Sequence, residues 1–105
     1  MHNTQIDDVA GVLKAMAHPI RLKILYLLGD EELSVCQLRA SVQTTNANIS
    51  QHLSILRRHG VITCRKEANF IYNRIADPRI TQLIQNLQGL FCATRVNSDK
   101  THKAE

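Results

Sequence analysis

The sequence predicts a mainly helical fold with one small β-hairpin. Through most of the 105 residues, apolar side chains recur every three or four positions, which is the spacing of an amphipathic helix. The pattern changes over residues 61–67 and 70–76, which are rich in β-branched and aromatic residues and are separated by a turn at Ala68-Asn69. The predicted order is helix, helix, short strand, helix, helix, hairpin, helix.

The first two helices are predicted on either side of a proline. Residues 6–16 carry one apolar stripe, and Asp7 and Asp8 lie near the expected start, where the helix dipole favours acids. Pro19 breaks this helix and fits the first turn of a second one, which covers residues 19–28. A short extended segment follows before the third helix.

The remaining helices are predicted from their capping residues. Ser34 is the expected cap of a helix over residues 35–41, and Thr45 is the expected cap of a helix that Gly60 ends. Asp77, followed by a proline, caps the last helix, whose apolar stripe continues almost to the polar end of the chain.

Length and charge limit the class of protein. The chain is long enough for one domain, expected over residues 1–95, and the polar residues 96–105 are expected to form a disordered tail. The formal charge of +4 favours a polyanionic partner, nucleic acid before membrane. No apolar run approaches the roughly 20 residues of a membrane helix, and the start lacks a signal-peptide pattern. A cytoplasmic protein without a membrane partner is therefore expected.

The three cysteines, Cys36, Cys64 and Cys92, are expected to be free thiols in that compartment. Their odd number and the absence of a Cys-x-x-Cys spacing argue against a disulfide framework and against a closed zinc site. An enzyme is not expected, because the sequence has no glycine-rich phosphate loop and no nucleophile elbow.

The two helices on either side of residues 43–44 form a candidate helix-turn-helix, in which the second helix enters the DNA major groove. The first two turns of that helix carry short neutral hydrogen-bonding groups, which match the edges of bases. Basic residues at its end and on the hairpin suit phosphates. The candidates are Asn46, Asn48, Ser50 and Gln51 for bases, and Arg57, Arg58, Arg65 and Lys66 for phosphates.

A polar outer face is also common on solvated helices that bind nothing. A basic hairpin directly after the second helix is the winged-helix arrangement, and this combination favours double-stranded DNA as the partner. A DNA-binding protein without any sensor and a protein-interaction module are the alternatives from other functional classes.

Four segments, "LKAMAHPIRLKILYLL", "ELSVCQL", "ISQHLSILRRHGVI" and "RKEANFIYNRI", together resemble the ArsR/SmtB family of bacterial winged-helix repressors. The resemblance covers about residues 12–93. It implies a homodimer, built from the first and last helices, that binds a short inverted-repeat operator. It also implies that a ligand or a cysteine reaction changes the affinity for DNA.

The resemblance assigns DNA contacts to the start of the recognition helix. It supports Asn46, Ser50 and Gln51 of the base-reading candidates and adds Thr45 and Ala47. Many members have Ser-His-His-Leu where this chain has Ser-Gln-His-Leu, so Gln51 is the expected base reader. His52 is expected to be buried and hydrogen-bonded.

The sensor is less clear from the resemblance. Metal-sensing members often carry Cys-Val-Cys in the third helix, where this chain has Ser34 and Cys36. A lone thiolate is a poor ligand set for arsenite or a soft metal ion, so Cys36 would need Cys64, Cys92 or a histidine. Such a site is one alternative.

The hemolysin-activator and sulfide-responsive branch is more similar in local sequence. Its members share the "RKEA" segment and an aromatic-Cys segment in the last helix, here Phe91-Cys92. There the cysteine pairs with one in the second helix, as a disulfide or a sulfur-bridged link, but this chain has Tyr26 at that position. The resemblance therefore implies persulfide or disulfide chemistry on Cys92. Either Cys36 has become its partner, or Cys92 reacts alone or with a thiol across the dimer, or the switch has been lost.

The two other cysteines are expected to differ. Cys36 lies in the first turn of a helix, where the dipole favours a reactive thiolate. Cys64 lies in an alternating strand and is expected to be structural. The resemblance thus implies a dimeric repressor, switched by cysteine chemistry, that needs no bound cofactor.

Overall fold

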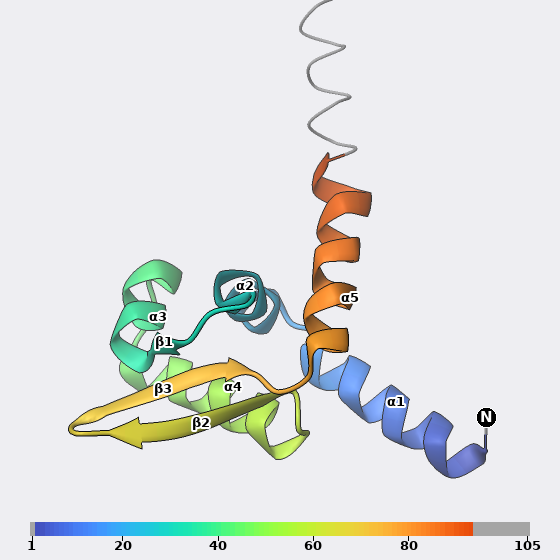
Figure 1. The fold of residues 1–105 in the computed structure, drawn as a ribbon, viewed down its shortest axis with the longest axis horizontal. Coiled ribbons are helices and arrows are strands. Elements are labelled where there is room, and N and C mark those ends of the chain that lie inside the picture. Colours follow the sequence, from blue (N-terminus) through green and yellow to red (C-terminus); the bar gives the residue numbers. More distant parts are fainter. Residues whose placement is uncertain (1, 94–105) are drawn as a thin grey trace, which may run out of the picture.

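The computed structural model describes the backbone of residues 2–93 and the side chains of residues 2–91. The predicted order of elements is confirmed (Figure 1). The elements are α1 (Asn3–Met16), α2 (Pro19–Leu28), β1 (Leu33–Ser34), α3 (Val35–Val42), α4 (Asn46–Arg58), β2 (Ile62–Glu67), β3 (Phe70–Ile75), α5 (Pro78–Gln88) and the π-helical turn η1 (Gly89–Ala93). The expected tail, residues 96–105, lies outside the described residues.

The strands form one antiparallel sheet in the order β1-β3-β2. Ser34 of β1 and Arg65 of β2 are both paired with Tyr72 of β3, so these three residues form one row across the sheet. The hairpin turn contains Ala68 with a φ of 55°, a left-handed conformation that glycine adopts more easily.

The first helix begins earlier than expected. It starts at Asn3, where the backbone N–H of His2 donates to Oε1 of Gln5 at 2.9 Å. The expectation that Asp7 and Asp8 lie in the first turn is therefore wrong, because they fall one turn later. The caps predicted for α3, α4 and α5 are correct, and the Asp77 carboxylate accepts from the backbone N–H of Arg79 at 2.8 Å.

The core lies between α2, α3, α4 and the sheet. Three residues of α2, Ile24, Leu25 and Leu28, have no exposed surface, and Leu38 and Leu56 pack around them in the same cluster. Burying each such side chain contributes roughly 1.5–3 kcal/mol, so α2 is the central element of the body.

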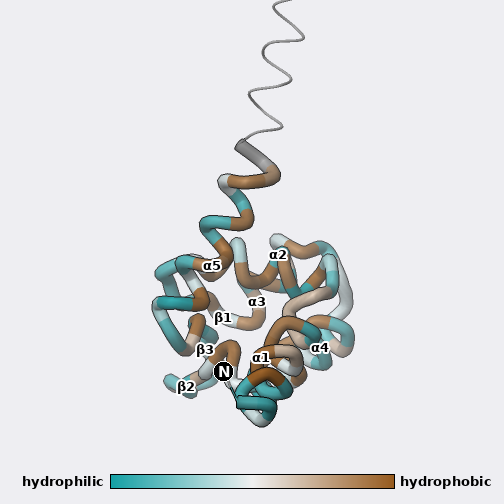
Figure 2. Tube along the Cα trace, turned by 90° about the vertical axis from the view of Figure 1, so that its right-hand side faces the viewer, coloured by the Kyte–Doolittle hydropathy of each residue, from teal (hydrophilic) through white to brown (hydrophobic). Residues whose placement is uncertain are grey.

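The two terminal helices extend away from this body (Figure 1), and both carry hydrophobic residues along their length (Figure 2). On α1, Val9 and Leu13 are 44% and 49% exposed, and on α5 and η1, Leu83 and Leu90 are 36% and 63% exposed. A groove of about 330 Å³ runs between α1 and α5 with Leu13 and Leu83 in its walls. An intramolecular core thus accounts for only part of each stripe, since Met16 of α1 and Ile84 of α5 are buried in it whereas these four residues are not.

Candidate nucleic-acid interface

The turn before α4 is held by local hydrogen bonds. Gln43 ends α3 in a left-handed conformation, with a φ of 59°. Oγ1 of Thr45 then accepts from the backbone N–H of Asn48 at 3.1 Å, which confirms Thr45 as the cap of α4. Nδ2 of Asn48 donates to Oγ1 of Thr44 at 2.8 Å, so this amide braces the turn.

One face of α4 is seated in the core through Ile49, His52, Leu53 and Leu56, each at most 8% exposed. Each buried Leu or Ile contributes roughly 1.5–3 kcal/mol, whereas a typical hydrogen bond contributes about 1 kcal/mol. Apolar burial therefore fixes the rotation of α4 about its axis. The opposite face is held outward with little freedom to turn.

The outward face carries most of the predicted base readers. Thr45, Asn46, Ala47, Ser50 and Gln51 are all exposed. Asn48 is different, because it is half-buried and bonded to the turn.

Ser54 is a further candidate base reader that the sequence did not single out. It is exposed and lies three and four residues after Gln51 and Ser50, on the same side of the helix. The helical spacing from Gln51 was the signal that could have identified it.

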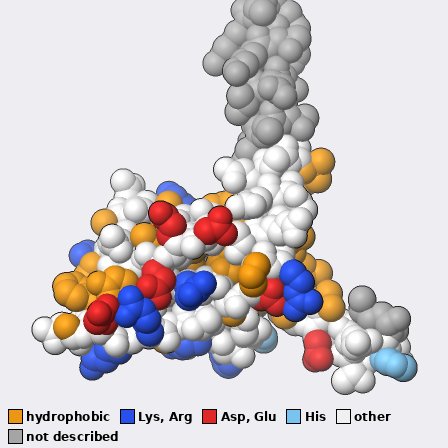
Figure 3. All heavy atoms as spheres, viewed as in Figure 1, with side chains coloured by type: hydrophobic (Ala, Val, Ile, Leu, Met, Phe, Trp, Pro, Cys, Tyr) orange, Lys and Arg blue, Asp and Glu red, His pale blue; other side chains and the backbone are white. Residues whose placement is uncertain are grey.

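The basic candidates form two groups. Arg57 and Arg58 are exposed in the last turn of α4, and Lys66 is exposed on β2. Strand alternation places Lys66 on the same side of the sheet as Cys64, whose Sγ lies 3.9 Å from Nη1 of Arg57. Lys66 thus shares a side of the sheet with α4. In Figure 3, acidic and basic side chains are interleaved over the hairpin, whereas the charged side chains along the lower edge of the body are Lys and Arg.

Arg65 lies on the other side of the sheet and already has acidic partners. Its Nε and Nη2 donate to the Glu32 carboxylate at 2.8 and 2.9 Å, and its Nη1 donates to Glu67 at 2.8 Å. The guanidinium also lies 4.9 Å from the centre of the Tyr72 ring. These hydrogen bonds from Arg65 hold the pKa of the Glu32 carboxyl below its usual range.

His52 is buried as predicted, but the expected hydrogen bond is not found. Its Nδ1 has no partner among the described residues, and neither has the nearby Nε of Arg21. The ring instead packs against His18, whose Nδ1 accepts from the backbone N–H of Ile20 at 3.1 Å and caps α2. Burial lowers the pKa of His52, and the electrostatic influence of His18 and Arg21 lowers it further.

The cysteines do not all lie where the sequence suggested. Cys36 is exposed in the first turn of α3 and lines a groove of about 200 Å³, together with Ser50 and the wing residues Phe70 and Ile71. Cys64 is exposed too, whereas a structural cysteine is usually buried: it lies on the outer strand β2, on the side that faces α4. The side chain of Cys92 lies outside the described residues.

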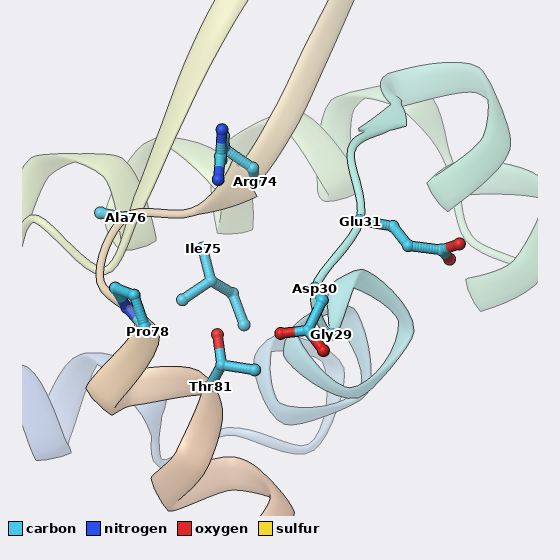
Figure 4. Close-up of a pocket in the computed structure, with 8 residues that line it drawn as sticks. All are labelled: Gly29, Asp30, Glu31, Arg74, Ile75, Ala76, Pro78 and Thr81. Atoms are coloured by element: carbon cyan, nitrogen blue, oxygen red, sulfur yellow. The ribbon is translucent and has the colours of Figure 1, made fainter.

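Within the described part of the chain, no group of three or more His, Cys, Asp or Glu side chains could hold a metal ion. A small hollow of about 80 Å³ lies where α2, β3 and α5 meet (Figure 4). It is lined by Asp30 and Thr81, among others, while Glu31 points away from it. Sites for small molecules usually measure about 300–1,000 Å³, so this hollow is too small for one.

A recognition helix seated by a buried face, a helix-turn-helix before it and a three-stranded wing after it define a winged helix-turn-helix DNA-binding protein. The model of bacterial regulatory proteins of the arsR family matches residues 18–63. The biofilm growth-associated repressor of Agrobacterium fabrum is 38% identical over 90 residues, covering 86% of this chain and 77% of that protein. The chain belongs to the ArsR family of DNA-binding transcriptional regulators, which are not enzymes.

Solved structures agree with this assignment. The transcriptional activator HlyU of Vibrio cholerae is 40% identical over 81 residues, covering 77% of this chain and 75% of that protein. Its structure matches with a TM-score of 0.82 at 35% identity, over 87% of this chain and 99% of that chain, and its reduced form matches with 0.80. The homodimeric winged helix-turn-helix DNA-binding domain Mb0332 of Mycobacterium bovis matches with 0.77 at 31% identity, over 83% of this chain and 81% of that chain.

The family and these structures imply DNA binding and a homodimer. Among the helices of the described residues, none has the length and apolar character needed to span a membrane.

Proposed function

We propose that the protein is a homodimeric repressor that binds an inverted-repeat operator through α4 and whose affinity is switched by cysteine chemistry. The observation that carries this proposal is the row of exposed, neutral hydrogen-bonding groups on the first two turns of α4. The opposite face of the same helix is buried, so the row is presented in one fixed orientation.

Gln51 is the base reader in this proposal. Its amide can donate and accept at once, which matches the two groups of an adenine edge in the major groove. Ser50 and Ser54 lie beside it on the same face and can bond to any base. Thr45, Asn46 and Ala47, at the helix start, complete the base-facing set, and Asn48 supports the set by holding the turn.

Phosphate contacts come from Arg57, Arg58 and Lys66. All three are exposed and none takes part in an ion pair among the described residues. Such contacts release counterions from DNA, so affinity falls steeply as salt rises.

The dimer is formed by α1 and α5 of both copies. Their exposed apolar stripes, with Leu13 and Leu83 along the groove between them, supply the surface to be covered. A two-fold axis through this surface presents two copies of α4 to half-sites about one helical turn apart, roughly 34 Å, as an inverted repeat requires.

The switch acts through Cys36, with Cys92 as the second thiol. Cys36 lies in the groove between α3, Ser50 of α4 and the tip of the wing, so a group added to its sulfur occupies the space between the two DNA-binding elements. The family resemblance at Phe91-Cys92 supports a second thiol in the reaction.

The DNA-binding proposal is tested with two variants on two kinds of DNA. A duplex enriched from a randomised library by the wild-type protein serves as the operator, and an unrelated duplex serves as the random site. Gln51→Ala is expected to cost about 1–3 kcal/mol on the operator and little on random DNA. Lys66→Ala is expected to weaken binding to both and to lower the slope of log affinity against log salt by about one.

If the two variants behave alike on both duplexes, the assignment of Gln51 to a base and of Lys66 to a phosphate is wrong. If the wild type enriches no sequence and binds no duplex, the proposed function itself is wrong.

A further inference from the structure

Arg65 was expected to contact phosphate, but its hydrogen-bonding groups face the protein. Nε and Nη2 form a two-point contact with the Glu32 carboxylate, and Nη1 bonds to Glu67. Two-point contacts of this kind fix direction as well as distance, because the planar guanidinium and the carboxylate must be parallel. Arg65 thus has a defined orientation although its side chain is half exposed.

The contact joins parts of the sheet that the backbone does not join. Arg65 belongs to β2 and Glu32 immediately precedes β1, but β3 separates these two strands. The guanidinium crosses β3 above the ring of Tyr72, with 4.9 Å from Cζ to the ring centre. A charged group over an aromatic face adds attraction at this crossing.

The segment of Glu32 leads directly into the helix-turn-helix. Ser34, two residues later, caps α3, and its backbone N–H and hydroxyl are both bonded to Gln37. The ion pair therefore connects the outer strand of the wing to the start of α3. A wing held in this way has one preferred angle to α3 and α4.

Lys66, the next residue, provides the contrast. Alternation along β2 directs it to the opposite side of the sheet, where it is paired with Ile71 near the wing tip. It is exposed and forms no ion pair among the described residues.

We infer that Arg65 is a positioning residue: with Glu32 and Tyr72 it sets the angle of the wing so that Lys66 meets the DNA backbone. This inference rests on the proposed DNA-binding function. Its distinctive consequence concerns Glu32. Removing a carboxylate near DNA ordinarily strengthens binding, because it removes repulsion from the phosphates. If Glu32 holds the wing, removing its charge weakens binding instead.

The experiment measures operator affinity by fluorescence anisotropy over a series of salt concentrations, with the full chain and the duplex enriched by the wild type. Glu32→Gln is expected to weaken binding roughly five- to tenfold, as a lost positioning contact does, with the salt slope unchanged. Glu31→Gln is the matched control: it removes the same charge from the adjacent exposed residue, which forms no ion pair among those described, and it is expected to leave affinity equal or slightly higher.

Arg65 itself is tested in the same assay. Arg65→Gln is expected to weaken binding without changing the salt slope, whereas Lys66→Gln lowers that slope by about one. Arg65→Lys keeps the charge but loses the two-point geometry, and it is expected to behave like Arg65→Gln. The exchange Glu32→Arg with Arg65→Glu is expected to recover part of the affinity that either single change loses.

Thermal unfolding of each variant, followed by circular dichroism, identifies any that fails to fold, and Arg65→Lys then replaces that variant in the comparison. Tighter binding by Glu32→Gln, or a salt slope lowered by Arg65→Gln, overturns the inference while the proposed function stands. Absence of any DNA binding by the wild type overturns both.

Discussion

The rings of His18 and His52 are in contact, with centroids 4.4 Å apart and planes tilted by 42°. His18 caps α2, and His52 belongs to the buried face of the recognition helix. The charged or titratable side chains that act on His52 are His18 and Arg21, both able to carry positive charge. Burial of the ring, and then these two side chains, make a proton on His52 unfavourable in the folded protein.

This contact predicts that stability falls in mild acid. Because the pKa of His52 is below 6.5 in the folded state, the unfolded chain binds more protons below that pH. The contribution of neutral His52 is fully present above pH 6.5 and is lost as the pH falls from there through the lowered folded pKa. Urea unfolding between about pH 7.5 and about pH 5 measures the decline.

His52→Gln is expected to flatten this decline, although it lowers stability at neutral pH. His59→Gln, which replaces an exposed histidine at the end of α4, is the control and should keep the wild-type pH dependence. An unchanged pH dependence in His52→Gln would show that another group is responsible.

The exposed stripes predict that one charge on α5 disrupts the dimer. Leu83, 36% exposed, lines the groove next to α1, and a carboxylate there would have to be buried without a partner when two copies associate. Leu83→Glu is expected to sediment as a monomer at concentrations where the wild type is a dimer. Gln82→Glu adds the same charge at the preceding residue, which lies outside that groove, and should remain dimeric.

The sequence predicted well those features, such as helix caps, that depend on residues close together in the chain. The caps Ser34, Thr45 and Asp77 are bonded to groups two or three residues away, so the local pattern was sufficient. Arg65 was assigned to phosphate because it is a basic residue on the hairpin. Its partner Glu32 is 33 residues away, and only the strand register brings the two together.

The same distinction explains the histidine and the terminal helices. The family resemblance predicted that His52 is buried, but it could not show that His18 and Arg21 are its neighbours. The stripes of α1 and α5 were visible in the sequence as well. Whether these stripes pack into the core of one copy or against a second copy depends on the direction in which the helices leave the body. Apolar spacing does not determine that direction.

The wing turn predicts a stabilising substitution. Ala68 has a φ of 55°, where its Cβ is crowded by the backbone, and glycine has no Cβ. Ala68→Gly is expected to increase the free energy of unfolding by about 0.5–1 kcal/mol, since the strain removed exceeds the entropy that glycine adds to the unfolded chain. Chemical denaturation measures the change.

Ala40→Gly is the control for that substitution. Ala40 is exposed within α3, where helical geometry favours alanine over glycine by about 1 kcal/mol, so this variant should be less stable than the wild type. Equal destabilisation by the two variants would mean that the strain at Ala68 is negligible.

The groove beside Cys36 predicts which thiol governs DNA binding. Ser50, on the recognition helix, and Phe70 and Ile71, at the wing tip, line the same space as Cys36. A sulfur chain or a larger adduct on Cys36 pushes these elements apart, so treatment with polysulfide or iodoacetamide is expected to release the operator. Anisotropy on each treated sample, with the intact mass, relates the lost affinity to the number of modified thiols.

Single replacements then separate the three cysteines. Cys36→Ser is expected to keep its affinity after treatment, whereas Cys64→Ser should lose affinity as the wild type does, because Cys64 lies outside this groove. If Cys36→Ser is still released and Cys92→Ser is not, the switch belongs to the last helix. Loss of operator affinity after arsenite, but not after polysulfide or iodoacetamide, would indicate that the cysteines form an arsenite-binding site instead. If affinity survives modification of all three thiols, the protein is a DNA-binding regulator whose signal does not act on cysteine.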